Sequence, residues 1–162
     1  MKKLRIYLDT SVINFLFADD SPDFRKATVE FFTQHAQKYA LYISEVVLVE
    51  IARDPNHAHR QKLESALQQY AMALLPADRR GEIERLGDLY IAQRVIPAGN
   101  RDDAFHVAYA TVFEIDVLLS WNFKHLANVR RETLILAVNQ KEGYRHPLRL
   151  LSPLEVEDET ED

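Results

Sequence analysis

The segment Leu4–Ser11, LRIYLDTS, places an acidic residue directly after a short apolar run. The apolar run is rich in residues that favour β-strands, and Asp9 follows its last residue. A similar arrangement occurs twice more: Glu50 lies shortly after the run Tyr39–Ser44, and Asn122 follows the run Val117–Ser120. These repeated strand ends predict that polar side chains gather at one end of a sheet.

Short apolar runs alternate with helical patterns along the chain. We expect strands at Leu4–Leu8, Tyr39–Ser44, Ala71–Leu75, Val117–Ser120 and Leu148–Leu151. We expect helices at Ser11–Ala18, Asn56–Gln69, Asp78–Val95, Asp102–Phe113 and Arg130–Glu142, and two more after Ser21 and Ser44. This alternation predicts an α/β fold with a central, mostly parallel sheet of four to five strands flanked by helices.

Ligands of a parallel sheet bind outside the carboxyl ends of its strands. Asp9, Glu50 and Asn122 map to that edge. Asp102 and Asp103 join them only if their helix begins at the same edge, which the strand pattern leaves open. Gathered carboxylates repel one another unless they stay protonated or hold divalent cations. The second state would make the edge a site for phosphodiester chemistry.

The length and charge of the chain fit one domain followed by an acidic tail. The chain has 162 residues and a formal net charge of −5, and six of its acidic residues lie in Glu155–Asp162. Without that segment, 19 acidic residues face 20 basic ones, a balance of about +1 that does not by itself argue for a nucleic-acid substrate. We expect a domain at residues 1–154 and a disordered acidic tail at residues 155–162.

Other classes of protein lack support in the sequence. No apolar run approaches the roughly 20 residues that cross a bilayer, and there is no cysteine for disulfides or thiolate metal sites. No Gly-rich phosphate loop is present. We therefore expect a cytoplasmic protein with no membrane partner.

Four segments, in order, resemble the motifs of the PIN-domain nucleases, in particular the VapC-type toxins of toxin–antitoxin pairs. They are Ile6–Val12, Val47–Ile51, Asp103–Ala110 and Leu119–Leu126. Together they cover Leu4 to about Leu126, and their order makes the match more specific than any one of them.

The resemblance implies a single PIN-like domain that hydrolyses RNA phosphodiester bonds with Mg²⁺ or Mn²⁺. Its catalytic residues would be Asp9, Glu50, Asp103 and Asn122. Asp9 and Asp103 would bind the metal directly, Glu50 directly or through water, and Asn122 would position a metal-bound water. The resemblance also places the start of the Asp103 helix at the pocket, and it implies a homodimer and a small antitoxin protein. Many members have Asp where this chain has Asn122, which offers an oxygen but no charge.

The acidic residues also have structural alternatives. Asp9 could initiate a turn, and Glu50 could lie on an exposed helical stripe. Asp102 and Asp103 both favour a helix N-terminus that Asn100 would cap. We interpret Asp103 as the ligand and Asp102 as its helper.

The neighbouring polar residues also have both a possible site role and a structural alternative. Thr10 and Ser11 either orient a metal-bound water or form local caps, and Asn122 serves the site or caps residues 122–127. His106 is interpreted as a packed core histidine. Lys124 and His125 are candidates for phosphate contacts, and the other RNA-binding residues are unknown.

Two other functions remain as alternatives. One is a metal-dependent phosphatase with an aspartyl nucleophile, although such enzymes need a second Asp where this chain has Ser11. The other is a non-catalytic RNA-binding or scaffold module on the same fold, which Asn122 motivates.

Overall fold

Five parallel strands form one sheet in the order β3-β2-β1-β4-β5. The computed structural model describes residues 2–159, with side chains as far as Val156. The strands are β1 (Arg5–Leu8), β2 (Ala40–Ile43), β3 (Ala73–Leu74), β4 (Val117–Leu119) and β5 (Arg149–Leu151). The expected α/β fold with a parallel sheet of four to five strands is therefore confirmed.

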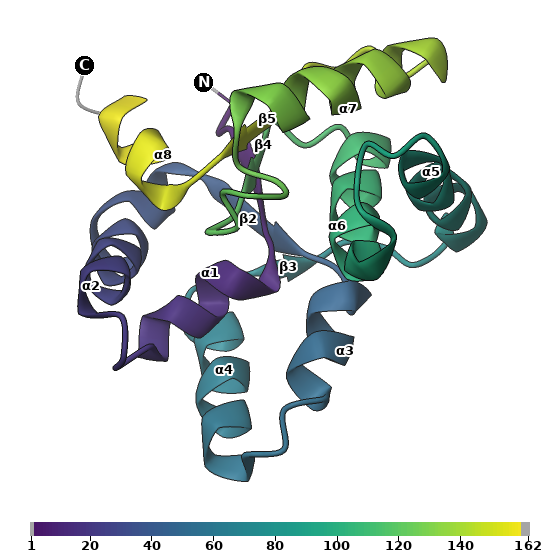
Figure 1. Cartoon of the computed structure of the whole chain (residues 1–162). Helices are drawn as coiled ribbons and strands as arrows, with labels where there is room; N and C mark the ends of the chain where they lie inside the picture. The colour runs from purple at the N-terminus through teal and green to yellow at the C-terminus, as the bar shows by residue number, and fades with distance from the viewer. Residues whose placement is uncertain (1, 160–162) are drawn as a thin grey trace.

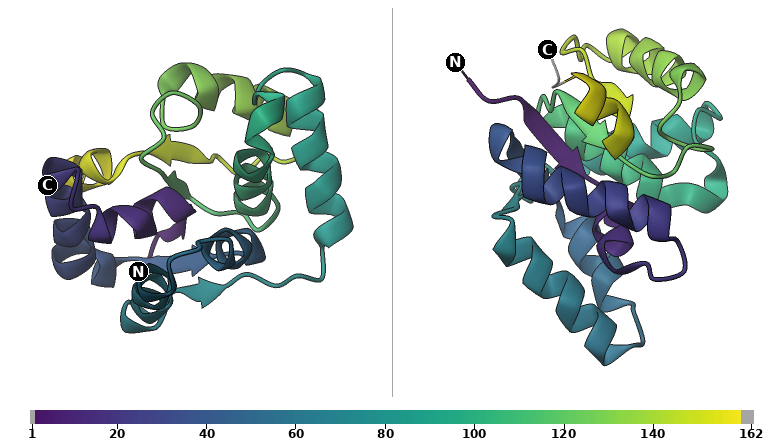
Figure 2. Two further views of the ribbon diagram at one scale, coloured as in Figure 1. Left: turned by 60° about the horizontal axis from the view of Figure 1, so that its bottom comes forward. Right: turned by 90° about the vertical axis from the view of Figure 1, so that its left-hand side faces the viewer.

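Helices cover both faces of this sheet (Figures 1 and 2). They are α1 (Thr10–Asn14), α2 (Pro22–Glu30), α3 (Glu45–Ala52), α4 (His57–Gln69), α5 (Arg80–Ala92), α6 (Arg101–Val112), α7 (Val129–Lys141) and α8 (Pro153–Glu159). Shorter turns are η1 (Phe15–Phe17), η2 (Phe31–His35), η3 (Ala36–Lys38) and η4 (Ala98–Asn100). None of the described helices is long and apolar enough to cross a membrane.

The central strands are buried on both faces, as parallel strands between helical layers usually are. In β1, Ile6, Tyr7 and Leu8 have no exposed surface. Helix α6 is buried along most of its length, as its nearly continuous apolar sequence predicts. A Cβ atom added to Gly87 of α5 would lie 2.5 Å from the Phe105 ring of α6, so glycine lets these two helices approach closely.

Helix α6 begins at the carboxyl edge of the sheet, which settles the question that Asp102 and Asp103 left open. A helix that connects two parallel strands must run antiparallel to them, so it begins where strands end and finishes where they begin. Its last turn accordingly lies at the amino edge, where the Arg5 side chain donates to the Phe113 carbonyl over 2.6 Å.

Two expectations from the sequence are wrong in detail. Asn100 is the residue before α6, but its side chain makes no cap hydrogen bond and donates to Asp103 instead. The expected boundary between residues 154 and 155 falls inside α8, which continues to Glu159. Val156, which has 3% exposed surface, packs in the core and helps to order this helix. Residues 160–162 of the expected acidic tail lie outside the described residues.

Candidate active site

Asp9 is held at the carboxyl end of β1, between β2 and β4. It is the residue before α1, and its Oδ1 accepts hydrogen bonds from the backbone N–H of Val12 and from the Ser11 hydroxyl at 2.5 Å. Its Oδ2 accepts from the Ser120 hydroxyl, also at 2.5 Å, at the end of β4. Only 3% of Asp9 is exposed. The turn-forming role suggested for Asp9 is therefore confirmed, and its carboxylate lies at the edge where the sequence predicts the site.

The electrostatic environment of Asp9 disfavours its ionised form. Burial raises the pKa of Asp9, and the charge of Asp103 raises it further. The charge of His106 and the hydroxyls of Ser11 and Ser120 oppose this shift without cancelling it. Burial is therefore the main cause of the shift, and it outweighs the positive charge of His106.

Glu50 of α3 is connected to His106 of α6, which the sequence did not place in the site. Glu50 Oε1 accepts from the Thr10 hydroxyl over 2.8 Å and lies 2.6 Å from His106 Nε2. The other ring nitrogen, Nδ1, lies 2.6 Å from the Tyr7 hydroxyl, which lies 2.7 Å from the Ser44 hydroxyl. The interpretation of His106 as a core residue is correct about its burial, at 1% exposed, but misses its contact with Glu50.

Despite its burial, His106 has a raised pKa because of the negative charges of three carboxylates. Burial alone would lower the pKa of His106, but the hydrogen bond and charge of Glu50, and then the charges of Asp9 and Asp103, raise it. Burial would raise the pKa of Glu50, but His106 and Thr10 outweigh burial and lower it. The imidazole therefore supplies part of the positive charge that this acidic cluster needs.

Asp103 lies in the first turn of α6 and is oriented by two amides. Its Oδ2 accepts from the Asn100 and Asn122 side chains, each over 3.1 Å. Asn122 also caps the turn that follows it, because its Oδ1 accepts from the backbone N–H of His125. The capping alternative for Asn122 is thus confirmed, and its amide also contacts the candidate site residue Asp103.

Asp102 points to a different partner from Asp103. It pairs with Arg53 at 2.8 Å. A cavity of about 440 Å³ opens beside this pair. It is lined by Glu50, Arg53, Gly99, Asn100, Arg101, Asp102 and Asp103. Two arginines thus line the cavity beside the carboxylates, where an anionic substrate could be bound. The Arg101 guanidinium pairs with Asp88 over 3.3 Å and lies over the Phe105 ring.

The donor set suits a hard cation that keeps most of its water. Among the described residues, no group of three or more His, Asp or Glu side chains lies so that it could hold a metal ion by itself. Hydrogen bonds within residues 2–159 use only Oε1 of Glu50 and only Oδ2 of Asp103. Each side chain therefore keeps one free carboxylate oxygen. Mg²⁺ usually takes one or two carboxylates and fills its other positions with water and phosphate, so these residues fit such an ion.

The structure brings Asp9, Glu50, Asp103 and Asn122 together and adds residues that the sequence analysis missed. Ser120 could have been found, because it ends β4 as Asp9 follows β1. His106, Tyr7 and the cavity arginines carried no such signal, since their contacts join segments far apart in the chain.

The suggested phosphate contacts, Lys124 and His125, follow Asn122 in the same loop. Lys124 is exposed and His125 is half-buried. Nδ1 of His125 is the single buried side-chain nitrogen or oxygen in the described part of the chain that has no hydrogen-bond partner. The loop therefore has an unsatisfied polar atom close to Asn122.

Comparisons with known proteins agree with this architecture. The PIN domain profile matches residues 6–131, whereas no curated protein matches the chain. The chain is similar to one in the crystal structure of VapBC2 from Rickettsia felis bound to a DNA fragment from their promoter. The two are 16% identical, the alignment covers 92% of this chain and 98% of the other, and the TM-score is 0.56. At this identity the likeness concerns the fold, but the profile spans well over half of the sequence. The chain therefore belongs to the PIN domain family.

Proposed function

We propose that this protein is a divalent-metal-dependent endoribonuclease. The observation that carries the proposal is the convergence of Asp9, Glu50 and Asp103 around His106, beside a cavity lined by two arginines. PIN domains are generally nucleases, which supports the same class of chemistry. The raised pKa of Asp9 is the electrostatic signature of a site that a cation would stabilise.

The side chains divide the work of phosphodiester hydrolysis. Asp9 and Asp103 would hold Mg²⁺ or Mn²⁺, with Glu50 as a direct or water-mediated ligand. When bound, the cation supplies positive charge to the scissile phosphate and activates water for attack. Arg53 and Arg101 bind the phosphate backbone, a contact that adds affinity but little sequence specificity.

Positioning depends on the hydrogen bonds already present in the structure. Ser11 and Ser120 hold both oxygens of Asp9, while Asn100 and Asn122 orient Asp103. An aspartyl-phosphatase mechanism lacks the second Asp that it needs, because Ser11 stands at that position.

The direct test is incubation of the purified protein with a set of structured RNAs, with Mn²⁺ and with a chelator. We expect cleavage that requires Mn²⁺ and stops when the chelator is added. A calorimetric titration with Mn²⁺ separates the enzyme from a scaffold module. Absence of both Mn²⁺ binding and cleavage would favour the scaffold.

We further propose that the protein is the toxin of a toxin–antitoxin pair, acts as a homodimer in the cytoplasm and binds a small antitoxin. The similarity to a chain of the VapBC2 complex supports this role. We expect expression without a partner to slow growth of the host, and the Asp103→Asn variant to relieve that effect. Normal growth with abundant soluble protein would count against the toxin role while leaving nuclease chemistry on a narrow substrate possible.

A further inference from the structure

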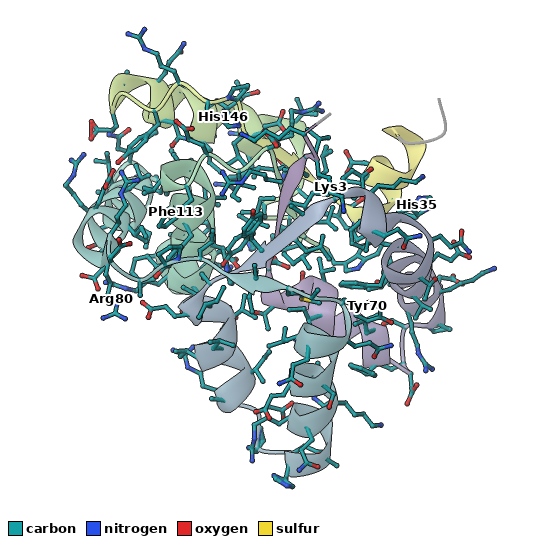
Figure 3. The ribbon with its side chains drawn as sticks, turned by 180° about the vertical axis from the view of Figure 1, so that it is seen from behind. Lys3, His35, Tyr70, Arg80, Phe113 and His146 are labelled. Carbon is teal, nitrogen blue, oxygen red and sulfur yellow. The ribbon has the colours of Figure 1, made fainter. Side chains whose placement is uncertain are left out.

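Two cavities open at the amino edge of the sheet, opposite to the carboxylates. The first, of about 520 Å³, lies where β1, β4 and β5 begin and is lined in part by Arg5, Phe113 and Arg145. The second, of about 490 Å³, lies where β2 and β3 begin and is lined in part by Lys3 and Tyr70. Figure 3 views this side of the molecule and shows Phe113 and His146 to the left of Lys3 and Tyr70.

Three cations of this edge, Lys3, Arg5 and Arg145, make no ion pair with the described residues, whereas Arg79 in the lining of the first cavity pairs with Glu82. The Arg5 guanidinium donates to the carbonyls of Phe113 and Glu114, and Lys3 donates to the carbonyl of Gln37. Arg145 is exposed and makes no hydrogen bond or ion pair with the part of the chain that the structure describes. Glu114 is the acidic residue among those that line the two cavities. These three cations therefore face two acids of this edge, Glu114 and Asp116, which leaves a small excess of positive charge.

Aromatic rings lie between these cations and connect the two cavities. The Arg5 guanidinium, which lines the first cavity, lies 4.9 Å from the ring centroid of Tyr42, which lines the second. Tyr70 and Phe113 are both only partly buried, one in each cavity lining. Alternating cations and partly exposed aromatic rings are the two components that bind single-stranded nucleic acid.

We propose that the amino edge is a second RNA-binding surface, which takes a single-stranded segment of the substrate away from the cleavage site. This inference rests on the proposed nuclease function, because it assumes an RNA substrate. Lys3 and Arg145 contact phosphates, and Tyr70 stacks on a base. The strands of three to four residues separate the two edges by roughly 13 Å, so one RNA of modest length reaches both.

The charge component is tested by removing two cations that make no ion pair. The cleavage-deficient Asp103→Asn protein, without divalent cations, is titrated with labelled oligouridylate of roughly 12 nucleotides. We expect Lys3→Gln with Arg145→Gln to weaken binding about tenfold or more. The salt dependence, as the slope of log affinity against log salt, should fall by about 1.4 for two lost phosphate contacts on a single strand. Lys62→Gln with Arg94→Gln, which removes the same charge elsewhere, is the matched control and should change both values little.

The stacking component is tested by Tyr70→Leu, which keeps an apolar side chain but removes the ring face. We expect oligouridylate affinity to fall about fivefold or more, as for one lost base stack, and the affinity for inorganic polyphosphate to stay the same. Equal losses for both ligands would overturn base recognition. A change in sedimentation coefficient of these variants without RNA would instead assign the surface to contact between copies of the chain and overturn the inference.

The outcomes for the two edges are separable. If the amino-edge variants bind oligouridylate as the control does, while cleavage still requires Asp9 and Asp103, this inference fails and the nuclease proposal stands. If the unaltered protein shows no Mn²⁺-dependent cleavage of any RNA, the nuclease proposal fails instead. The amino-edge variants should cleave short RNA at the normal rate and long RNA with a raised KM.

Discussion

The two edges of the central sheet carry opposite charges, although the same short strands connect them. The carboxyl edge has Asp9, Glu50 and Asp103, and burial raises the pKa of Asp9. The amino edge has Arg5 and Lys3, which donate hydrogen bonds to backbone carbonyls and make no ion pair with the described residues. In a parallel sheet every strand begins at one edge and ends at the other, so residues before and after the strands separate completely. Burial and like charges therefore destabilise the acidic edge, whereas hydrogen bonds to carbonyls stabilise the basic edge.

Neutralising the acidic edge should remove activity without unfolding the protein. We expect Asp9→Asn and Asp103→Asn each to lower Mn²⁺-dependent RNA cleavage by about 100-fold or more, comparable to the loss of a major electrostatic group in other enzymes. Asp102→Asn, whose side chain pairs with Arg53 instead, is the matched control and should lose much less. Near-normal cleavage by either main variant would remove that residue from the site.

The stability of the same Asp9→Asn variant should rise in the metal-free protein near neutral pH. Because the folded-state pKa of Asp9 is raised, its contribution is full below the ordinary carboxyl pKa and is lost as the pH rises through the raised value. The Asn side chain does not titrate, so the variant does not lose this stability as the pH rises. The measurement is the melting temperature of the unaltered protein and of Asp9→Asn across that pH range, in the presence of a chelator. A variant that melts at a lower temperature near pH 7 would show that ionised Asp9 does not destabilise the fold.

Neutralising an acid at the amino edge should have the opposite effect. Asp116 accepts from the Arg5 backbone N–H over 2.8 Å and from His146 over 2.8 Å. We expect Asp116→Ala to lower the free energy of unfolding by about 2 kcal/mol, with short-RNA cleavage unchanged below the new melting temperature. Thermal denaturation checks this, with Asp116→Asn as a milder control. An unchanged melting temperature would show that these bonds contribute nothing.

Removing the positive charge within the acidic edge tests the role of His106. We expect His106→Gln to lower Mn²⁺ affinity about tenfold, because Glu50 loses the partner that fixes Oε1. Calorimetry measures the affinity, and circular dichroism confirms that the buried substitution leaves the fold intact. A folded variant with unchanged affinity would limit His106 to packing.

Adding a negative charge to the acidic edge should tighten Mn²⁺ binding and destabilise the metal-free protein. Asn122→Asp keeps the oxygen that caps His125 but replaces the amide that donates to Asp103 with a carboxylate. We expect severalfold tighter Mn²⁺ binding and a lower melting temperature without metal, since like charges then face each other. Weaker or unchanged binding would show that Asn122 serves only to orient Asp103.

The smallest effect is expected from the backbone of the amino edge. Glu114 ends α6 with φ of 53°, in the left-handed region that favours glycine. We expect Glu114→Gly to raise the free energy of unfolding by about 0.5 kcal/mol, because relief of the side-chain clash slightly exceeds the added chain entropy. Chemical denaturation measures the change. A loss of stability would mean that the side chain contributes more than the strain costs.

The sequence by itself determined the architecture and the main acidic positions. Alternating apolar runs and helical patterns predict the parallel sheet because buried strands and amphipathic helices need different hydrophobic periods. Asp9 was identifiable because it follows β1 directly, whereas the strand pattern left the place of Asp103 open and only the family resemblance put it at the same edge. The inferences from the strand pattern depend only on neighbouring residues and on chain direction.

Only the tertiary structure decided which side chains meet. His106 lies between Glu50 and Tyr7, which are 56 and 99 residues away along the chain, so no local pattern could distinguish it from an ordinary core histidine. Asp102 and Asp103 are adjacent in α6 but contact different partners. The Asp102 side chain accepts from Arg53, and the Asp103 side chain accepts from Asn122. Val156 orders the start of the expected tail only because the core offers it a contact. Local sequence sets the direction and period of each element, but hydrogen bonds and burial between distant elements depend on how those elements pack.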